Sequence, residues 1–399
     1  MDSTTARTLI AGRALRGFVD GSVAVLLPAY LLALGHDSFA VGVLGTITLL
    51  GSALATLAVG AWGHHAAPRT LLLAAALLMA ATGAGFAGFS SFAPLLLVAF
   101  VGTLNPGAGD VSVFLPLEHA RLAGLAHSSA ERTSLFARYS LAGVLSAAFG
   151  ALAVGVPAWL APRMGWAMVD ALRAMFVAYA AIGLVIWALY RRLPLPVAGS
   201  AQSAAPVPLG ASRPVVLKLA ALFSVDAFAG GLVLNSLMSL WLMQRFGLTL
   251  ANAGAFFFWS GLLGAVSQAV APWLARRIGL LNTMVFTHIP ANLCLIAAAL
   301  SPTMPLALGL LLVRALLSQM DVPTRTAYVM SVVTPPERAA AASFTAVPRS
   351  LASAASPALA GALFAGGWLA APLLLCGALK VAYDLTLWRA CRGHPLQGE

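Results

Sequence analysis

The sequence predicts an all-α membrane protein whose twelve transmembrane helices form two pseudo-symmetric six-helix bundles. Composition is the first reason. Of the 399 residues, 60% are hydrophobic and 9% are charged, whereas a soluble domain averages about 45 to 50% apolar and about 25% charged residues. So little polar surface cannot cover a water-exposed globule. The other two reasons are the lengths of the apolar runs and a repeat that relates the two halves of the chain.

Twelve apolar runs account for the predicted spans, because a helix needs about 20 mostly apolar residues to cross the hydrocarbon layer. Glycine, proline, charged or polar clusters separate the runs. Their uniform apolarity excludes a transmembrane barrel, whose strands alternate in polarity. The runs cover residues 13–34, 40–62, 70–90, 92–116, 134–158, 166–190, 215–244, 250–274, 280–300, 303–328, 340–364 and 368–389.

The first six spans follow a polar segment, residues 1–12, that carries no A-x-A cleavage signal, so we expect no removable signal peptide. Gly35 marks the turn after the first span, and residues 60–69 form a tight turn after the second. The segment 105–110 interrupts the fourth span with proline and two glycines. Such a break loosens the backbone where a gate must bend. A plain kink is the alternative.

The last six spans follow an extended stretch, residues 193–212, whose Pro, Ser, Ala and Gly content is typical of a linker. We therefore expect an N-terminal six-helix bundle at residues 1–192, a cytoplasmic linker at 193–213 and a C-terminal bundle at 214–399. In the tenth span, Pro323 interrupts the helix just after Asp321, much as the fourth span is interrupted just before its own acid.

Basic residues predict the orientation. With the N-terminus inside, the inner ends and loops hold most of the arginines, whereas the outer loops hold little beyond Arg163 and Arg245. Cytoplasmic loops carry such an excess. We therefore expect a multi-pass protein of a bacterial-type plasma (inner) membrane with both termini in the cytoplasm.

An internal repeat relates the two halves. Two rare charges inside spans, an acid and an arginine, are separated by 28 residues in both halves, which is unlikely to be chance. This pattern indicates two parallel repeats related by an axis along the membrane normal. The matched positions are Gly35 with Gly247 and Gly42 with Gly254 at an offset of 212, and Asp110 with Asp321 and Arg138 with Arg349 at an offset of 211.

These landmarks resemble those of the major facilitator superfamily (MFS) of secondary transporters, over nearly the whole chain. The inner turns after the second and eighth spans are degenerate copies of that family's G-x-L-x-D-R-x-G-R loop. His64 and Arg276 stand at the acid positions, so the usual loop chemistry does not carry over intact. The motif residues that survive are Gly60, Arg69, Arg277 and Gly279. No subfamily motif specifies a substrate.

The resemblance implies that helices 1, 4, 7 and 10 line a central cavity and that a small-molecule substrate crosses by alternating access. It also implies a monomer without a cofactor, and export is expected from the frequency of exporters in the family. Arg314 resembles the family's helix-4 arginine, displaced into the tenth span.

Asp20 and Asp226 are the predicted proton-coupling residues, because each is an acid in a cavity helix and an intramembrane charge needs a partner or a function. Two alternatives stay open. Asp20 can pair with Arg16 four residues earlier, and Asp226 can pair with Arg314, which would make a proton-controlled lock.

Five polar or aromatic side chains are predicted to bind substrate: Arg314, Asn105, Asn235, Gln319 and Trp241. A free guanidinium at Arg314 would bind an anionic solute. Asn and Trp in membrane helices serve equally often as packing contacts or interface anchors. The predicted cytoplasmic gate consists of Asp110, Arg138, Asp321, Arg325 and Arg349, with a static clamp as the alternative.

Two further charged pairs are interpreted as self-neutralising within one helix face. These are Asp170 with Arg173, and Lys380 with Asp384, although Lys380 also has a neighbouring helix within reach. His288 on the ninth span is expected to be structural.

Other classes of function are disfavoured. The net charge of +11 does not cluster with aromatics as in nucleic-acid binding, and no G-x-x-x-x-G-K-[ST] motif indicates ATP. A divalent metal transporter, with Asp20 and Asp226 as oxygen ligands, is the alternative within transport. An intramembrane enzyme lacks an H-E-x-x-H or G-x-S-x-G motif, and a sensor would not need paired acids.

Overall fold

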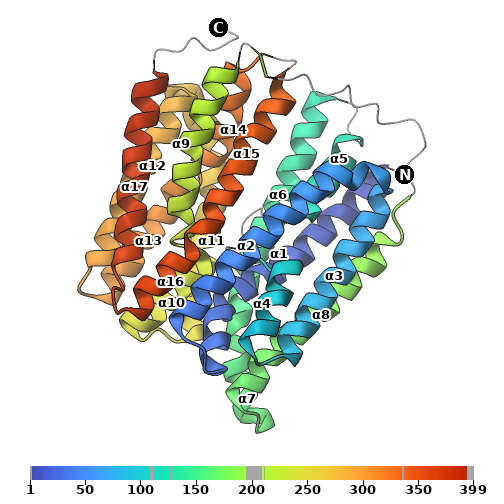
Figure 1. Ribbon diagram of the computed structural model, residues 1–399, viewed down its shortest axis with the longest axis vertical. Coiled ribbons are helices and arrows are strands. Elements are labelled where there is room, and N and C mark those ends of the chain that lie inside the picture. Colours follow the sequence, from blue (N-terminus) through green and yellow to red (C-terminus); the bar gives the residue numbers. More distant parts are fainter. Residues whose placement is uncertain are drawn as a thin grey trace. The chain divides into compact units, whose positions relative to one another are not determined.

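The computed structural model describes residues 2–107, 112–125, 128–194, 209–210, 212–334 and 337–392, and within these ranges the regular elements are helices (Figure 1). The predicted all-α membrane fold is confirmed. The chain forms two compact units. Unit 1 contains Met1–Ser200 with Leu234–Gly261, and unit 2 contains Ala201–Val233 with Leu262–Glu399.

Unit 1 is a bundle in which the helices of the first six predicted spans are joined by one helix and the start of another from later in the chain. Its helices are α1 (Asp2–Ala33), α2 (Ser38–Trp62), α3 (Pro68–Gly88), α4 (Phe92–Val101), α5 (Phe114–Ala123), α6 (Ser129–Leu152), α7 (Val156–Met164), α8 (Met168–Tyr190), α10 (Asn235–Phe246) and the start of α11 (Leu250–Ile278).

Side-chain caps begin two of these helices. The carboxylate of Asp37 accepts a hydrogen bond from the backbone N–H of Ala40 at 2.9 Å and starts α2. The hydroxyl of Ser128 accepts one from the N–H of Glu131 at 3.1 Å and starts α6. Each cap satisfies a donor that the first turn of a helix leaves without a partner.

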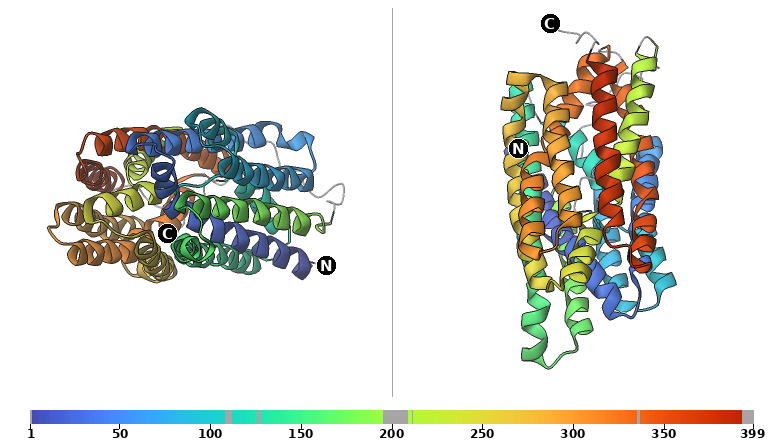
Figure 2. Two further views of the ribbon diagram at one scale, coloured as in Figure 1. Left: turned by 90° about the horizontal axis from the view of Figure 1, so that it is seen from below. Right: turned by 90° about the vertical axis from the view of Figure 1, so that its left-hand side faces the viewer.

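Small residues let α1 and α6 approach closely. A Cβ atom added to Gly21 would overlap the backbone oxygen of Ala147, and one added to Gly150 would overlap that of Phe18. Helices pack tightly in membranes where small residues let their backbones meet. Figure 2 shows the helices of each bundle running side by side.

Hydrogen bonds from α10 attach it to unit 1. The Ser239 hydroxyl donates to the backbone oxygen of Val25 in α1 at 2.9 Å, and the Gln244 amide donates to the Ser38 hydroxyl of α2 at 2.7 Å. The second part of the seventh predicted span therefore belongs to the first compact unit.

Unit 2 consists of the remaining helices. They are α9 (Arg213–Gly231), the rest of α11, α12 (Leu280–Leu300), α13 (Met304–Ser318), α14 (Asp321–Val332), α15 (Arg338–Ala355), α16 (Pro357–Ala365) and α17 (Ala371–Cys391). Its apolar core includes Phe223 of α9, Tyr328 of α14 and Tyr383 of α17. On α9 the core residues lie within 213–223, before Asp226 in the sequence. Asp226 therefore lies at the edge of a packed apolar cluster.

Ten helical stretches of the described residues are long and apolar enough to cross a membrane. The two other predicted spans are interrupted rather than missing. Residues 92–116 fall on α4, which ends at Val101, and α5, which begins at Phe114, and residues 340–364 fall on α15 and α16, which a break at Ser356 separates. Neither pair of helices forms one continuous stretch, so neither is counted among the ten.

Most of the predicted linker, residues 195–208 and 211, lies outside the described residues. Its last residues are held by a loop of unit 2. The Glu337 carboxylate accepts hydrogen bonds from the N–H groups of Gly210 at 2.6 Å and Ser212 at 3.0 Å. A hydrogen bond from the Ser212 side chain, together with the one from the Gly210 N–H, lowers the pKa of Glu337 to about 2. The division into domains at this linker stays a prediction.

Candidate functional site

Unit 1 buries a charged cluster that the sequence did not predict. Glu118 on α5 is fully buried and forms a two-pronged ion pair with Arg16 on α1, in which Nη2 lies 2.6 Å from Oε2. The hydroxyls of Tyr139 on α6 and Tyr190 on α8 both donate to the same carboxylate. Four helices therefore meet at one acid whose hydrogen bonds and charge are satisfied.

The predicted proton-coupling residue Asp20 lies one turn after Arg16 on α1. Arg16 forms its ion pair with Glu118 and not with Asp20, although Arg16 and Arg13 both attract the Asp20 carboxylate electrostatically. Asp20 is 8% exposed and makes no hydrogen bond or ion pair with any residue that the structure describes. A buried carboxylate without a cation or donor is costly when ionised.

Tyr179 of α8 connects Asp20 to the interrupted fourth span. It lies close enough to Asp20 for the two groups to interact electrostatically. The Tyr179 hydroxyl donates to the backbone oxygen of Thr103, just after α4, at 3.1 Å, and the Thr103 N–H donates to the Thr82 hydroxyl at 3.2 Å. These bonds satisfy backbone groups that a break at membrane depth would otherwise leave without partners.

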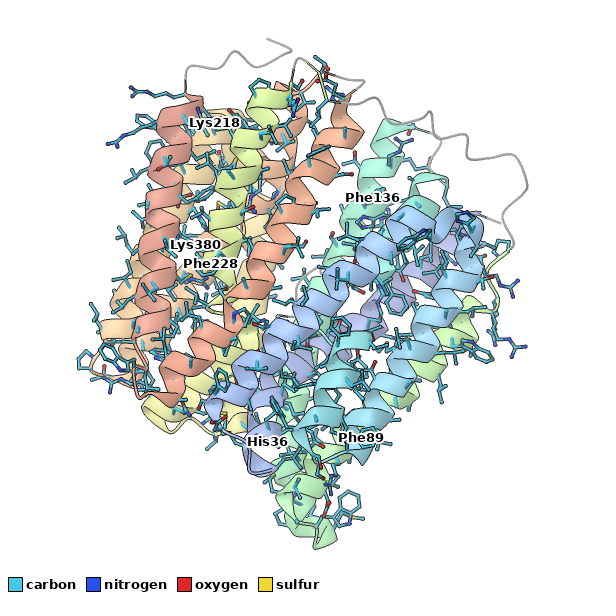
Figure 3. All side chains as sticks on the ribbon, in the orientation of Figure 1. His36, Phe89, Phe136, Lys218, Phe228 and Lys380 are labelled. Carbon is cyan, nitrogen blue, oxygen red and sulfur yellow. The ribbon has the colours of Figure 1, made fainter. Side chains whose placement is uncertain are left out.

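Asp226, the second predicted coupling residue, occupies a different environment in unit 2. Its carboxylate lies 2.5 Å from Nζ of Lys380 on α17 and 2.9 Å from Nη2 of Arg325 on α14. Arg325 also pairs with Asp321 at the start of α14. Figure 3 shows Lys380 at the level of Phe228, which lies two residues after Asp226 on α9. The cluster is thus a chain of acids and bases across three helices.

Two predicted pairings are corrected here. Asp226 does not pair with Arg314, because Arg325 and Lys380 occupy its carboxylate. Lys380 does not pair with Asp384 in its own helix, because its ammonium lies against Asp226 on α9. Asp384 instead lies 3.0 Å from Nδ1 of His288 on α12. His288 therefore belongs to an acid–base pair between helices.

Arg314 lies on α13 beside the thiols of Cys294 on α12 and Cys376 on α17. Its Nε atom is buried and has no hydrogen-bond partner among the described residues. The guanidinium therefore faces the neighbouring helices α12 and α17 of its own unit.

The predicted gate residues are only partly brought together. Asp110 lies outside the described residues, so its pairing with Arg138 stays a prediction, and Arg138 is exposed on α6. The predicted pair of Asp321 with Arg349 is replaced by Asp321 with Arg325, one helical turn away on α14. Arg349 lies on α15 with an exposed side chain.

The remaining predicted substrate residues lie near breaks in helices. Asn105 is 2% exposed in the segment after α4, and Asn235 is the first residue of α10. The N–H of Ser236 donates to the backbone oxygen of Pro106 at 3.1 Å, which joins the two places. Trp241, on α10, is fully buried, and its indole N–H has no partner among the described residues.

Gln319 follows α13, where it accepts a hydrogen bond from Gln268 of α11 at 3.3 Å. The motif-loop residues lie at the ends of helices. Gly60 lies near the end of α2, and Arg69 in the first turn of α3 donates to the backbone oxygen of Arg191. In the second loop, the guanidinium of Arg277 packs over the Trp273 ring, 5.3 Å from its centroid. Gly279, between α11 and α12, takes a φ of +85°.

One apolar cavity of about 180 Å³ lies in unit 1 between α2, α3 and the residues that flank the break after α4. Ligand pockets usually measure about 300 to 1,000 Å³, and none of the predicted substrate residues lines this cavity. Among the described residues, no group of three or more His, Cys, Asp or Glu side chains is placed to hold a metal ion.

Comparison with known proteins points to one family. A sequence model of the Major Facilitator Superfamily matches residues 9–320. An uncharacterized membrane protein of Saccharomyces cerevisiae is 24% identical over 403 residues, which cover 91% of this chain and 88% of the yeast protein.

Solved transporters share the fold. The nucleoside transporter NupG superposes with a TM-score of 0.72 at 15% identity, over 96% of this chain and 98% of NupG. The inward-open xylose transporter XylE from E. coli superposes with a TM-score of 0.73 at 16% identity, over 96% of each chain.

Proposed function

The chain belongs to the Major Facilitator Superfamily, and from this premise we propose that it is a proton-coupled secondary active transporter that exports a small organic solute by alternating access. As a member of this family the chain is a multi-pass membrane transporter. Proton coupling, direction and solute are the parts proposed here.

Asp20 carries the proposal of proton coupling. It is buried on the first helix, and Arg16 beside it forms its ion pair with Glu118, so Asp20 is attracted by Arg16 and Arg13 but is paired with neither. A conformational change that alters the access of water to such a group alters its affinity for a proton. Binding and release of a proton at Asp20 would then accompany each cycle.

Asp226 is proposed as the second coupling residue, in a different way. Because Lys380 and Arg325 both hold its carboxylate, it takes part by exchanging partners as the helices move. The proposed gate of Asp321, Arg325 and Arg349, with Asp110 and Arg138 in the first half, acts on the same principle. An ion pair that breaks and re-forms favours one of two conformations.

The proposed substrate residues are Asn105, Asn235, Gln319, Trp241 and Arg314. Support comes from the hydrogen bond between Ser236 and Pro106, which brings the neighbours of Asn235 and Asn105 together. Transporters of this kind often bind solutes at such helix breaks. Nucleosides and pentoses, the solutes of the structurally similar transporters, are the first classes to test.

The proposed location is a bacterial-type inner membrane, with both termini in the cytoplasm and a monomeric chain. The positive-inside distribution of arginines supports this orientation. Labelling single cysteines placed near residues 5 and 165 with a membrane-impermeant reagent tests it. Labelling of residue 5 from outside intact cells would reject the orientation.

Transport in proteoliposomes tests the coupling. A thermal-shift screen of nucleosides, pentoses and organic anions first identifies a solute, because a ligand stabilises the state that it binds. We expect Asp20→Asn to abolish accumulation driven by a pH gradient while solute exchange continues. Asp170→Asn, at an exposed pair of the same unit, is the matched control and should transport normally.

Gradient-driven accumulation that is unchanged in Asp20→Asn would reject the coupling role of this residue. Accumulation without any pH gradient would reject proton coupling altogether. Inside-out vesicles test the direction. Solute uptake into inside-out vesicles with an acidic lumen supports export. No uptake into these vesicles, together with uptake into right-side-out vesicles with an acidic exterior, rejects export.

A further inference from the structure

The pair of His288 and Asp384 in unit 2 has no part in the function proposed above. The imidazole Nδ1 of His288 on α12 lies 3.0 Å from the carboxylate of Asp384 on α17. Both side chains are buried, at 4% and 1% exposure. The ring of Tyr383 packs edge-on against the imidazole, with 6.4 Å between ring centroids. Histidine is the side chain whose ordinary titration falls in the physiological pH range.

The surrounding charges give this pair its importance. The charged and titratable side chains that surround the pair, directly or through one neighbour, come from five helices. They are Asp226 on α9, Arg314 on α13, Asp321 and Arg325 on α14, Arg349 on α15, and Cys376, Lys380 and Tyr383 on α17. Arg314 packs beside thiols, and Arg349 has an exposed side chain. Neither forms an ion pair with a residue that the structure describes.

The ion-paired part of this cluster lacks one positive charge. It contains three carboxylates, those of Asp226, Asp321 and Asp384, and two permanent cations, Arg325 and Lys380. One proton on the His288–Asp384 pair makes the buried set neutral. Arg349 attracts Asp226 and Asp321 from its exposed position but is not paired with Asp384. Without that proton the Asp384 carboxylate therefore has no cation paired with it, which is costly in a buried environment.

Lys380 is placed to respond to that charge. Its Nζ lies 2.5 Å from Asp226 on α9, and Asp384 follows it by four residues on α17. Residues four apart on a helix lie on the same face. The flexible lysine side chain therefore has two carboxylates within reach, one on a neighbouring helix and one on its own.

We propose that His288 and Asp384 bind one exchangeable proton, and that this proton decides whether Lys380 pairs with Asp226 or with Asp384. With the proton bound, the imidazolium and the Asp384 carboxylate neutralise each other, and Lys380 stays on Asp226. When the N–H bond of the imidazolium breaks, the proton passes to water and the carboxylate is left without a cation. Lys380 then moves to Asp384, and the ion pair that joins α17 to α9 is lost.

This proton site goes beyond the coupling roles proposed for Asp20 and Asp226, because neither residue holds the proton in question. It also stands or falls without a known solute. A failure of the transport experiment above leaves the proton site untouched, and a failure of the experiment below leaves proton coupling at Asp20 untouched.

The lysine content of the chain allows a direct test. Lys218 and Lys380 are the two lysines of the sequence, so the full-length protein labelled with [13C,15N]lysine and placed in lipid bilayers gives two Cε–Nζ signals in solid-state NMR. Lys218→Arg assigns them. We expect the Lys380 signal of the wild type to move as the pH is raised, while the Lys218 signal stays constant.

Two variants should hold Lys380 in opposite states. His288→Gln cannot carry the proton, so the Lys380 signal should match the high-pH wild type at every pH. Asp384→Asn removes the competing carboxylate, so the signal should match the low-pH wild type at every pH. His36→Gln, at an exposed histidine that contacts the Ser90 backbone oxygen, is the matched control and should respond as the wild type does.

A Lys380 signal that is independent of pH in the wild type overturns the proposal. So does an identical pH response in wild type and His288→Gln. If one variant does not fold, the other still decides, because each predicts a different constant signal.

Discussion

The buried ion pair between Arg16 and Glu118 makes a quantitative prediction. Glu118→Gln removes one charge and leaves the other enclosed, since Arg16 is 2% exposed and Glu118 is fully buried. Breaking a buried pair on one side costs about 3 to 5 kcal/mol. The loss of one acceptor oxygen for the hydroxyls of Tyr139 and Tyr190 acts in the same direction. We therefore expect a loss near the upper end of that range, about 5 kcal/mol.

Removing both charges should restore most of the stability. In Arg16→Met with Glu118→Gln, both charges of the pair are removed, and the glutamine oxygen still accepts a hydrogen bond from a tyrosine. Replacing both partners of a buried pair is often neutral or stabilising, so this double variant should lie within about 2 kcal/mol of the wild type. The double-mutant cycle then gives a coupling energy of at least about 3 kcal/mol.

Unfolding in mixed micelles with increasing SDS, followed by circular dichroism, measures these free energies. Asp170→Asn is the control, because its pair with Arg173 is exposed and such pairs contribute about 0 to 1 kcal/mol. If Glu118→Gln unfolds within about 1 kcal/mol of the wild type, or if the two single losses simply add in the double variant, the cluster does not support unit 1 in this way.

Three further predictions follow from single contacts. Asp226→Asn should cost about 3 to 5 kcal/mol because it removes the buried carboxylate that both Lys380 and Arg325 hold. Asp321→Asn should cost less because Arg325 keeps Asp226; SDS unfolding compares them, and equal losses would contradict the chain of pairs. Gly150→Val should separate α1 from α6 and destabilise the protein in the same assay, whereas Gly165→Ala, at a solvent turn with a φ of +65°, should cost only its backbone strain. The pKa of Glu337 falls from 4.5 to about 2 on folding. The stabilisation from its hydrogen bonds to Gly210 and Ser212 is therefore fully present above pH 4.5 and is lost as the pH falls through about 2. Amide-exchange protection of these two residues, corrected for intrinsic rate, should follow that course and be weak at all pH values in Glu337→Gln.

The helices could be predicted from sequence because lipid imposes a simple rule on them. Long apolar runs mark spans whatever their neighbours are, and they predict the all-α membrane fold, whereas the family is implied by the resemblance of the inner loops to a family motif. The interruption at Asn105–Gly107 was equally visible, because proline and glycine act on the local backbone. Such signals lie within one segment and do not depend on how segments pack.

The partners of the buried charges could not be predicted, because they depend on packing between distant helices. Spacing in the sequence offers partners three or four residues away, such as Asp384 for Lys380 and Arg16 for Asp20. The structure pairs Lys380 with Asp226, 154 residues away, and Arg16 with Glu118, 102 residues away. The rotation of each helix about its axis decides between these choices, and apolar runs leave that rotation unspecified.

Glu118 was missed for a second reason, which lies in the boundary of a span. The apolar run of the fourth span ends near residue 116, which places Glu118 just outside it. In the structure the helix restarts at Phe114, and Glu118 lies in the middle of the buried face of α5. An interrupted helix resumes with its own register, so the polar residues after a break can face the core.

Each unit buries an ion pair between two helices, but the helices that carry the acid and the base are exchanged between the units. In unit 1 a base on α1 pairs with an acid on α5, and in unit 2 an acid on α9 pairs with a base on α14. In each case the first helix of a predicted half meets the second part of an interrupted helix. At the offsets of 212 and 211 found for these two parts of the repeat, Arg16 and Glu118 would correspond to positions 228 and 329, two residues beyond Asp226 and one turn beyond Arg325. Buried charges need a compensating charge at this junction, but neutrality does not specify which helix supplies which sign. A search for the same residue type at a fixed offset therefore overlooks an ion pair that occurs in both units.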